Sequence, residues 1–206
     1  MNKNICFVRT IIPADQFKKK YETGGLVIYH AGEELDSDMN AYKCYECSVP
    51  TPDFSEEDVL AAYNKFKESM DKIELSNAVR AKKAEINAYD TKEGAGCVNN
   101  FYFEYGGQKF PYCFNAYERT ALSAEATAWA KKYGTYRIDA RKYGVSFEIS
   151  CDTLLEWLGQ LSDYAIKCFN KTSEHLRNVE ALTSVVDVEK YDYKTGYPDN
   201  LIFKIK

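Results

Sequence analysis

Residues 154–182 read LLEWLGQLSDYAIKCFNKTSEHLRNVEAL, and a long helix is expected here. Apolar or small side chains recur along it at Leu154, Leu158, Leu161, Ala165, Cys168, Thr172, Leu176, Val179 and Leu182. Eight steps cover 28 residues, and a mean spacing of 3.5 residues is typical of a helix packed lengthwise along another helix. We therefore predict a helix that begins at Ser150 or Asp152, ends near Leu182, and packs against a helix of this chain or of another copy.

A second long helix is expected over residues 55–88, as a spacer. Ser55 is a suitable N-cap, and the three acidic residues after it favour the positive end of the helix dipole. Apolar residues step by four and three at positions 59, 63, 66, 70 and 73, and then restart at 75, 79 and 86. This displacement predicts a kink or a change of packing partner between Glu74 and Asn77.

Residues 1–54 are expected to form a small β-rich domain. Its predicted elements are strands at 4–12, 26–30 and 41–49, and a short helix from Pro13 to Tyr21. The acidic segment 31–40 is interpreted as a solvated loop or hairpin tip, and Pro50 and Pro52 close the domain. About 50 residues with three strands are marginal for independent stability, so we expect contacts outside this domain to stabilise it.

Residues 89–206 are expected to form an α+β domain. It is predicted to begin with a hairpin that turns at Gly106-Gly107, followed by a helix over 116–133 that Gly134 ends. A second hairpin of strands 135–139 and 145–149 then leads into the 154–182 helix. A short helix over 184–190 and a strand at 201–205 are the last predicted elements. The whole chain is therefore predicted to be α+β. It has a small β-rich N-terminal domain (1–54), a spacer helix (55–88) and a C-terminal domain (89–206) of two β-hairpins with helices, one of about 30 residues.

The composition excludes several classes of function. The 206 residues carry 27 Lys and Arg against 31 Asp and Glu, a formal charge of −4, so they lack the cationic excess that a general nucleic-acid binder needs. With 45% hydrophobic and 28% charged residues, the chain has the composition of a globular protein. The sequence shows no secretory signal peptide and no long apolar run, so we expect synthesis in a cytoplasm and neither a membrane nor a nucleic acid as partner.

Seven cysteines are scattered along the sequence, at positions 6, 44, 47, 97, 113, 151 and 168. An odd and sparse set is not a disulfide framework, so we expect reduced, mostly buried thiols. Cys44 and Cys47 have the spacing of half a zinc ribbon or of a redox pair, but they fall in a predicted strand, where residues three apart point to opposite faces. Because the sequence has no second pair with this spacing, we predict no metal site and no cofactor.

The remaining candidates for catalysis are few. His30 and His175 are the two histidines, and without a G-x-S-x-G or H-E-x-x-H motif we expect both to be ordinary half-exposed residues. One polar segment holds four acids, namely Glu33, Glu34, Asp36 and Asp38. Nothing in that segment is expected to raise a carboxyl pKa, so we interpret these acids as solvated surface. We therefore predict no catalytic residue.

Four short segments allow both a structural and a functional interpretation. Gly106-Gly107-Gln108 matches the tripeptide of peptide-release factors, but aromatic strands flank it, which favours a hairpin turn. Residues 94–96, Gly-Ala-Gly, are too short to cradle a phosphate and are interpreted as a linker. Residues 170–172, Asn-Lys-Thr, have the glycosylation pattern but fall inside a predicted helix. The tyrosine-rich tail, residues 191–201, either packs on the fold or contacts a partner.

The C-terminal part of the sequence carries a family resemblance. It runs through KKAEINAYDT (82–91), VNNFYF (98–103), the 154–182 helix with its CFNKTSEH, and VEKYDYKTGYP (188–198). These pieces resemble a domain family of unknown function found in bacteriophages and prophages of gut Bacteroidales, which is similar to a module of phage tail-fibre-associated proteins. The resemblance covers residues 82–206. The chain departs from it at residues 110–114, FPYCF, where relatives often have a strand with a tryptophan. No catalytic residue is attributed to this family, so the resemblance implies none here.

The resemblance implies a place in a phage particle, and the residues agree with a protein that works through contacts. We expect a virion structural or adaptor protein, associated with the tail or tail fibre, whose partners are other phage structural proteins and further copies of the chain. A fibre-assembly chaperone, absent from the mature virion, is the alternative. A carbohydrate-binding module is a more distant one, as is an enzyme that uses Cys44 and Cys47.

Overall fold

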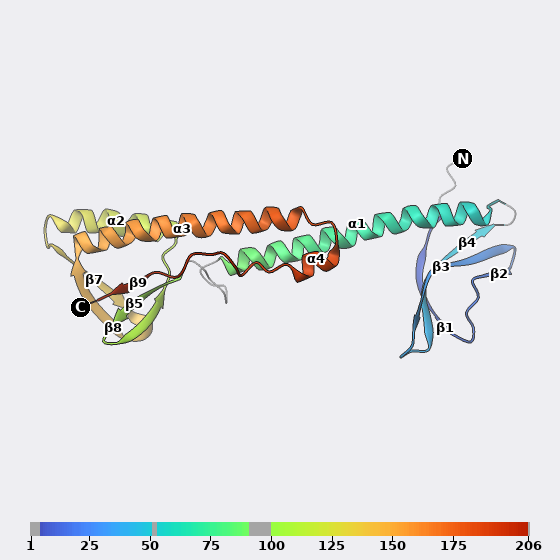
Figure 1. Ribbon diagram of the computed structural model, residues 1–206, viewed down its shortest axis with the longest axis horizontal. Coiled ribbons are helices and arrows are strands. Elements are labelled where there is room, and N and C mark those ends of the chain that lie inside the picture. The colour runs from blue at the N-terminus through green and yellow to red at the C-terminus, as the bar shows by residue number, and fades with distance from the viewer. Residues whose placement is uncertain (1–4, 51–52, 91–99, 206) are drawn as a thin grey trace. The chain divides into compact units, whose positions relative to one another are not determined.

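The computed structural model describes residues 5–50, 53–90 and 100–205 (Figure 1). The chain is α+β, as predicted, and it divides into two compact units, Met1–Glu74 and Leu75–Lys206. The boundary falls inside a long helix, α1 (Glu56–Tyr89), so the two halves of this helix belong to different units.

The first unit is built on a four-stranded antiparallel sheet. Its strands are β1 (Val8–Pro13), β2 (Lys20–Thr23), β3 (Leu26–Asp36) and β4 (Ala41–Pro50), in the spatial order β1-β4-β3-β2. Gly24 and Gly25 form the two-residue turn between β2 and β3, and both have positive φ angles, as such turns require. The predicted strands at 26–30 and 41–49 are confirmed within β3 and β4.

The predicted helix from Pro13 to Tyr21 is wrong. Pro13 is the last residue of β1 and lies opposite Ala41, while Tyr21 belongs to β2. The Ala14 N–H donates to the Asn40 carbonyl at 2.9 Å, and hydrogen-bonded pairs alternate along an antiparallel ladder. The nitrogen of Pro13 therefore points to the outer edge of the sheet, where a missing N–H breaks no bond. Edge geometry, which the local sequence does not reveal, decides the conformation here.

The acidic segment 31–40 is mostly strand, which corrects its interpretation as a loop. β3 continues to Asp36 through a bulge between Ala31 and Glu34, where Gly32 has a φ of 64°. An extra residue in one strand bends it without ending the pairing. Only residues 37–40 form the expected hairpin tip.

The core of the first unit lies between the sheet and the start of α1. Val27, Tyr29, Cys47, Val49 and Val59 are its buried members. An aromatic group extends this core, since Phe7 and Tyr45 both contact Tyr63 and Phe66 of α1. On the other face of the sheet, Phe17 stacks on Tyr42 with ring centroids 4.2 Å apart.

Helix α1 is uninterrupted from Glu56 to Tyr89 and begins as predicted. The Asp58 N–H donates to the Ser55 hydroxyl oxygen, and the Asp58 carboxylate accepts from the Ser55 backbone N–H at 2.9 Å. The predicted change of packing partner is confirmed, because Val59 belongs to the core of the first unit whereas Leu75, Val79 and Ile86 belong to a core of the second.

The second unit contains the remaining elements. They are β5 (Phe101–Tyr105), β6 (Gln108–Tyr112), α2 (Ala116–Ala130), β7 (Thr135–Ala140), a 3-10 turn (Arg141–Tyr143), β8 (Val145–Ser150), α3 (Cys151–Glu180), α4 (Val185–Lys190) and β9 (Ile202–Lys204). β5 and β6 form a hairpin that β9 joins by pairing parallel to β5, and β7 and β8 form a second hairpin. The two hairpins, the three helices and the terminal strand were predicted, whereas the 3-10 turn and the parallel pairing of β9 were not.

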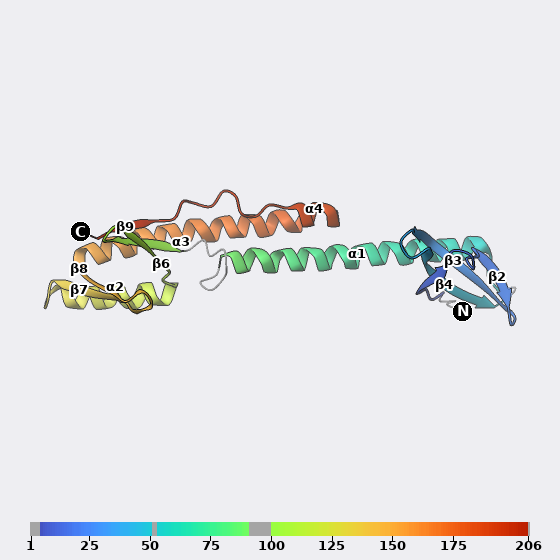
Figure 2. The ribbon, with the colours of Figure 1, turned by 90° about the horizontal axis from the view of Figure 1, so that it is seen from below.

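Helix α3 carries the core of the second unit along its whole length (Figures 1 and 2). Ser150 is its N-cap and accepts a hydrogen bond from the Thr153 N–H at 3.0 Å. Its buried residues are Cys151, Leu154, Leu158, Leu161, Tyr164, Cys168, Thr172, His175 and Val179. Tyr164 and His175 take the places expected for Ala165 and Leu176. The first half packs on α2 and the hairpins, and the second half packs on the end of α1, on α4 and on the tail. The apolar seam of α3 is thus closed within the second unit itself.

Candidate interaction surfaces

Cys44 and Cys47 lie in β4 and are both buried, at opposite faces of the sheet as predicted. Burial raises the pKa of each thiol, and nearby carboxylates such as Glu46 raise it further. A raised pKa keeps sulfur in the thiol form, which is neither a good nucleophile nor a metal ligand. Among the described residues, no group of three or more His, Cys, Asp and Glu side chains is placed to hold a metal ion.

The two histidines are buried, so the expectation that they are half-exposed is wrong. Each is 3% exposed. His30 contacts the Lys18 carbonyl through Nδ1 and the Glu46 carboxylate through Nε2, at 3.1 Å. Side chains alternate between the two faces of β3, and His30 lies on the face that Phe17 and Tyr21 cover. This alternation is the feature of the sequence from which the burial of His30 could have been predicted.

His175 closes the tail onto α3. Its Nε2 lies 3.0 Å from the carbonyl oxygen of Thr195, and its Nδ1 lies 2.8 Å from the hydroxyl of Tyr191. A carbonyl oxygen only accepts, so Nε2–H donates to Thr195 and Nδ1 accepts from Tyr191. Both ring nitrogens are therefore engaged in holding the fold.

Two of the four acids of segment 31–40, Glu33 and Asp36, pair with lysines. Glu33 lies 3.3 Å from Lys19, and Asp36 lies 2.6 Å from Lys43. A backbone hydrogen bond and then Lys19 hold the pKa of Glu33 below its usual value, and a hydrogen bond from Lys43 does the same for the pKa of Asp36. A lowered pKa fits a charged surface group and not a general acid.

The short motifs take structural roles. Gly106 and Gly107 form the turn between β5 and β6, with positive φ angles, as predicted. Thr172, the last residue of the Asn-Lys-Thr segment, is buried in α3, donates to the Asp90 carboxylate at 2.8 Å and lies 3.0 Å from the Tyr197 hydroxyl. The linker prediction for residues 94–96 lies outside the described residues.

The tyrosine-rich tail packs on the second unit. Tyr191 reaches His175, while the rings of Tyr193 and Tyr197 pack on that of Tyr89 near the end of α1. Burial raises the pKa of the Tyr197 phenol. These contacts agree with the packing alternative. Contact with a partner stays a prediction.

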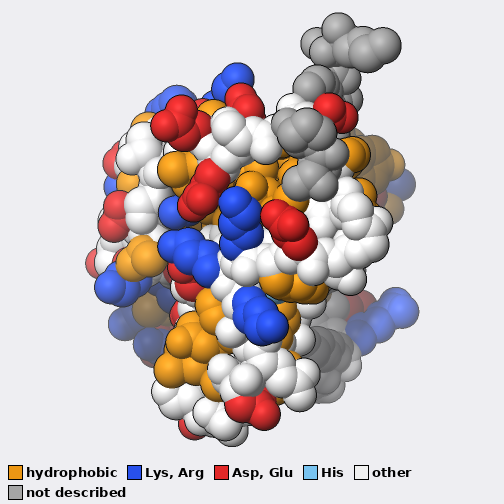
Figure 3. Space-filling view, turned by 90° about the vertical axis from the view of Figure 1, so that its right-hand side faces the viewer, with side chains coloured by type: hydrophobic (Ala, Val, Ile, Leu, Met, Phe, Trp, Pro, Cys, Tyr) orange, Lys and Arg blue, Asp and Glu red, His pale blue; other side chains and the backbone are white. Residues whose placement is uncertain are grey.

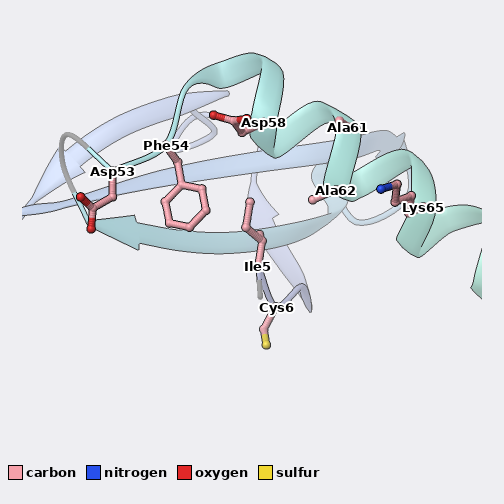
Figure 4. A pocket seen from close by; sticks show the side chains of 8 residues that line it. All are labelled: Ile5, Cys6, Asp53, Phe54, Asp58, Ala61, Ala62 and Lys65. Carbon is pink, nitrogen blue, oxygen red and sulfur yellow. The ribbon is translucent and has the colours of Figure 1, made fainter. Parts of the chain in front are cut away.

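Each unit also has a broad surface pocket. A pocket of the first unit, about 740 Å³, lies between the N-terminal segment and the first turns of α1, and Figure 4 shows Ile5 and Phe54 in it. Its charged residues are Asp53, Asp58 and Lys65. The pocket of the second unit, about 760 Å³, lies between α2 and α3 and is lined mainly by small residues such as Ala, Ser, Thr and Gly. Neither of these two linings contains a histidine that could act as a base. A smaller pocket of the first unit, about 220 Å³, is lined by His30 and Glu33, and both ring nitrogens of His30 are engaged with Lys18 and Glu46.

Large apolar side chains are exposed on both units. Val8 and Ile11 of β1 are 66% and 55% exposed, and Ile166 and Phe169 of α3 are exposed to a similar extent. Figure 3 shows hydrophobic side chains interspersed with charges of both signs on the face it presents. Singly exposed apolar side chains are common on folded proteins, and a large contiguous patch of them is what marks a surface that contacts other proteins.

Comparison with known proteins gave no match to a family model, a curated protein or a solved structure. Within the described part of the chain, no helix is both long and apolar enough to cross a membrane.

Proposed function

We propose that the protein is a bacteriophage virion structural or adaptor protein, associated with the tail or tail fibre. Its two units would dock different neighbours among the phage structural proteins. The assignment to a phage is based on the resemblance of residues 82–206. The docking role is based on the two separate cores of the chain and on the burial of its histidines and of Cys44 and Cys47.

Two separate cores share helix α1, and this is the main support for the docking role. Val59 is buried with the sheet of the first unit, and Ile86 is buried with α3 and α4 of the second. A continuous helix of 34 residues is about 50 Å long at 1.5 Å per residue. A chain built in this way offers two independent surfaces, as an adaptor requires.

The chemistry of the described residues supports the same proposal. The side chains most useful for catalysis are engaged in packing, because both histidines are buried and hydrogen-bonded and the Cys44 and Cys47 thiols are buried with raised pKa values. Ile166 and Phe169, three residues apart and both exposed on α3, are neighbours on one helix face and offer an apolar contact to another protein.

The test is the protein inventory of purified particles of the phage whose genome carries this gene. Mass spectrometry is expected to find the chain in particles purified through a density gradient, in a constant ratio to the other tail proteins. The infected-cell lysate is the control, since it contains virion and non-virion products alike. A chain abundant in the lysate and missing from the particles would contradict the proposal and favour the assembly chaperone.

A further inference from the structure

The two edges of the sheet in the first unit differ in how well they are protected. The β2 edge is four residues long and carries Lys20 and Glu22, and short charged edges resist pairing with other strands. The β1 edge is six residues long, reads VRTIIP, and has a single charged side chain, Arg9. Among the described residues no strand pairs with the outer side of β1, and its Val8 and Ile11 side chains are largely exposed.

The register of β1 shows which backbone groups point outward. Ala14 bonds to Asn40, so every second residue back from it, Ile12 and Thr10 included, is in a hydrogen-bonded pair with β4. The N–H and C=O groups of Arg9 and Ile11 therefore face the free edge. Pro13 has the same orientation but no N–H, so it ends the usable edge on one side.

From this geometry we infer that β1 pairs with β1 of a second copy of the chain, antiparallel and about a two-fold axis at Thr10. In this register Arg9 pairs with Ile11 of the second copy and Ile11 with its Arg9, through hydrogen bonds from both residues. Thr10 then lies opposite itself in a non-hydrogen-bonded pair, which is the closer kind. The two sheets join into one of eight strands.

The side chains of β1 favour this register. Val8 lies opposite Ile12 of the second copy and Thr10 lies opposite its Thr10, and both β-branched and Thr–Thr pairs stabilise antiparallel sheets. Arg9 is opposite Ile11, so the two arginines do not face each other. The same patch serves both copies, as a closed two-fold dimer requires. Pairing also covers Val8 and Ile11, which are exposed in the single chain.

This inference deepens the proposed function, because a second copy is one of the neighbours that a structural subunit contacts. The two proposals fail separately. A monomer found in purified particles contradicts the dimer alone, and a dimer absent from particles contradicts the virion role alone.

The first experiment measures the mass of the purified full-length chain by sedimentation over a dilution series. We expect twice 23.6 kDa at the concentrated end. Ile11→Pro removes an outward N–H from each copy and none from the β1–β4 ladder, so it is expected to weaken the dimer by roughly tenfold or more. Ile11→Val keeps the N–H and the branched side chain, and it should stay within about threefold of the unchanged protein.

The second experiment fixes the register and does not depend on how well Ile11→Pro folds. Thr10→Cys, in a chain with Cys6→Ser, places two thiols across the axis with Cα atoms about 4.5 Å apart, within disulfide range. Oxidation should link two chains completely. Val8→Cys in the same background is the control, because its partner position is Ile12 and the two new thiols are about 13 Å apart along the strands. A single-chain mass throughout the series overturns the inference, and so does equal cross-linking of Thr10→Cys and Val8→Cys.

Discussion

Tyr63 of α1 lies so close to Gly32 of β3 that a side chain at position 32 has no room. A Cβ atom built on Gly32 would lie 1.8 Å from the Tyr63 hydroxyl oxygen, and the φ of Gly32 is 64°. Glycine is thus required at position 32 both by the positive φ angle and by the closeness of Tyr63. At the scale of single residues, this contact attaches the bulge of β3 to the helix.

Gly32→Ala is expected to destabilise the first unit by more than about 2 kcal/mol, because strain in the backbone adds to a clash with the ring. Gly25→Ala is the matched control: its φ of 79° is also positive, but nothing lies within 4 Å of the new Cβ. It should cost about 1 kcal/mol. Urea unfolding of both variants measures the difference, and equal losses would show that the Tyr63 contact has no role.

Tyr136 provides a prediction on pH. Burial and the hydrogen bond that its hydroxyl donates to Glu125, at 2.7 Å, raise the pKa of Tyr136 to about 12. A raised pKa in the folded state stabilises the protein below the unfolded value of about 10, and this contribution is lost as the pH rises toward 12. Relative to Tyr136→Phe, the unchanged protein should therefore lose stability between pH 9 and 12, as thermal unfolding would record. If the stability of the two proteins changes equally over that range, the raised pKa of Tyr136 is contradicted.

At the scale of elements, α3 determines most of the second unit. Leu154 and Ile166 are similar aliphatic residues on the same helix, but the first is buried in the main core and the second is exposed. The difference arises because α2, the hairpins and the tail cover one side of α3 and leave Ile166 outside. Their substitution by alanine therefore separates packing from helix propensity.

Leu154→Ala is expected to cost about 2 to 5 kcal/mol through the cavity that it leaves. Ile166→Ala should stay within about 0.5 kcal/mol, since an exposed site loses little. Urea denaturation of the two variants at equal protein concentration checks this. A large loss for Ile166→Ala would mean that its face is covered in solution.

Elements were largely predictable from the sequence because their signals are local. The 3.5-residue spacing gave α3, Ser55 and Ser150 marked helix starts, and Gly106-Gly107 marked a hairpin. The prediction failed where contacts with a distant part of the chain determine the conformation. Pro13 is typical of the first turn of a helix, but here it ends a strand at the edge of the sheet. For the same reason the burial of His30 and His175 was missed, because their partners lie 12 to 20 residues away along the chain.

At the scale of the whole molecule, the chain divides into two compact units that share α1. Val59 and Ile86 lie on the same helix but in separate cores. A substitution at Val59 should therefore have little effect on the second unit, and one at Ile86 little effect on the first. Effects at distant sites with no shared partners are nearly independent.

Val59→Ala is expected to speed hydrogen exchange in β3 and β4 and to leave α3 unchanged, while Ile86→Ala should do the reverse. Each variant is the control of the other. Hydrogen exchange followed by mass spectrometry reads both regions in one experiment. If either variant speeds exchange equally in β4 and α3, the two units form one cooperative body and the adaptor account loses its basis.

Cross-linking mass spectrometry of intact purified phage particles shows whether the two units of the chain contact different neighbouring proteins. Lysine-reactive links from Met1–Glu74 and from Leu75–Lys206 are expected to reach different neighbouring proteins, with links between copies of the chain confined to the first unit. Particles that lack the chain, or links from both units to one and the same surface, would contradict the proposed adaptor role.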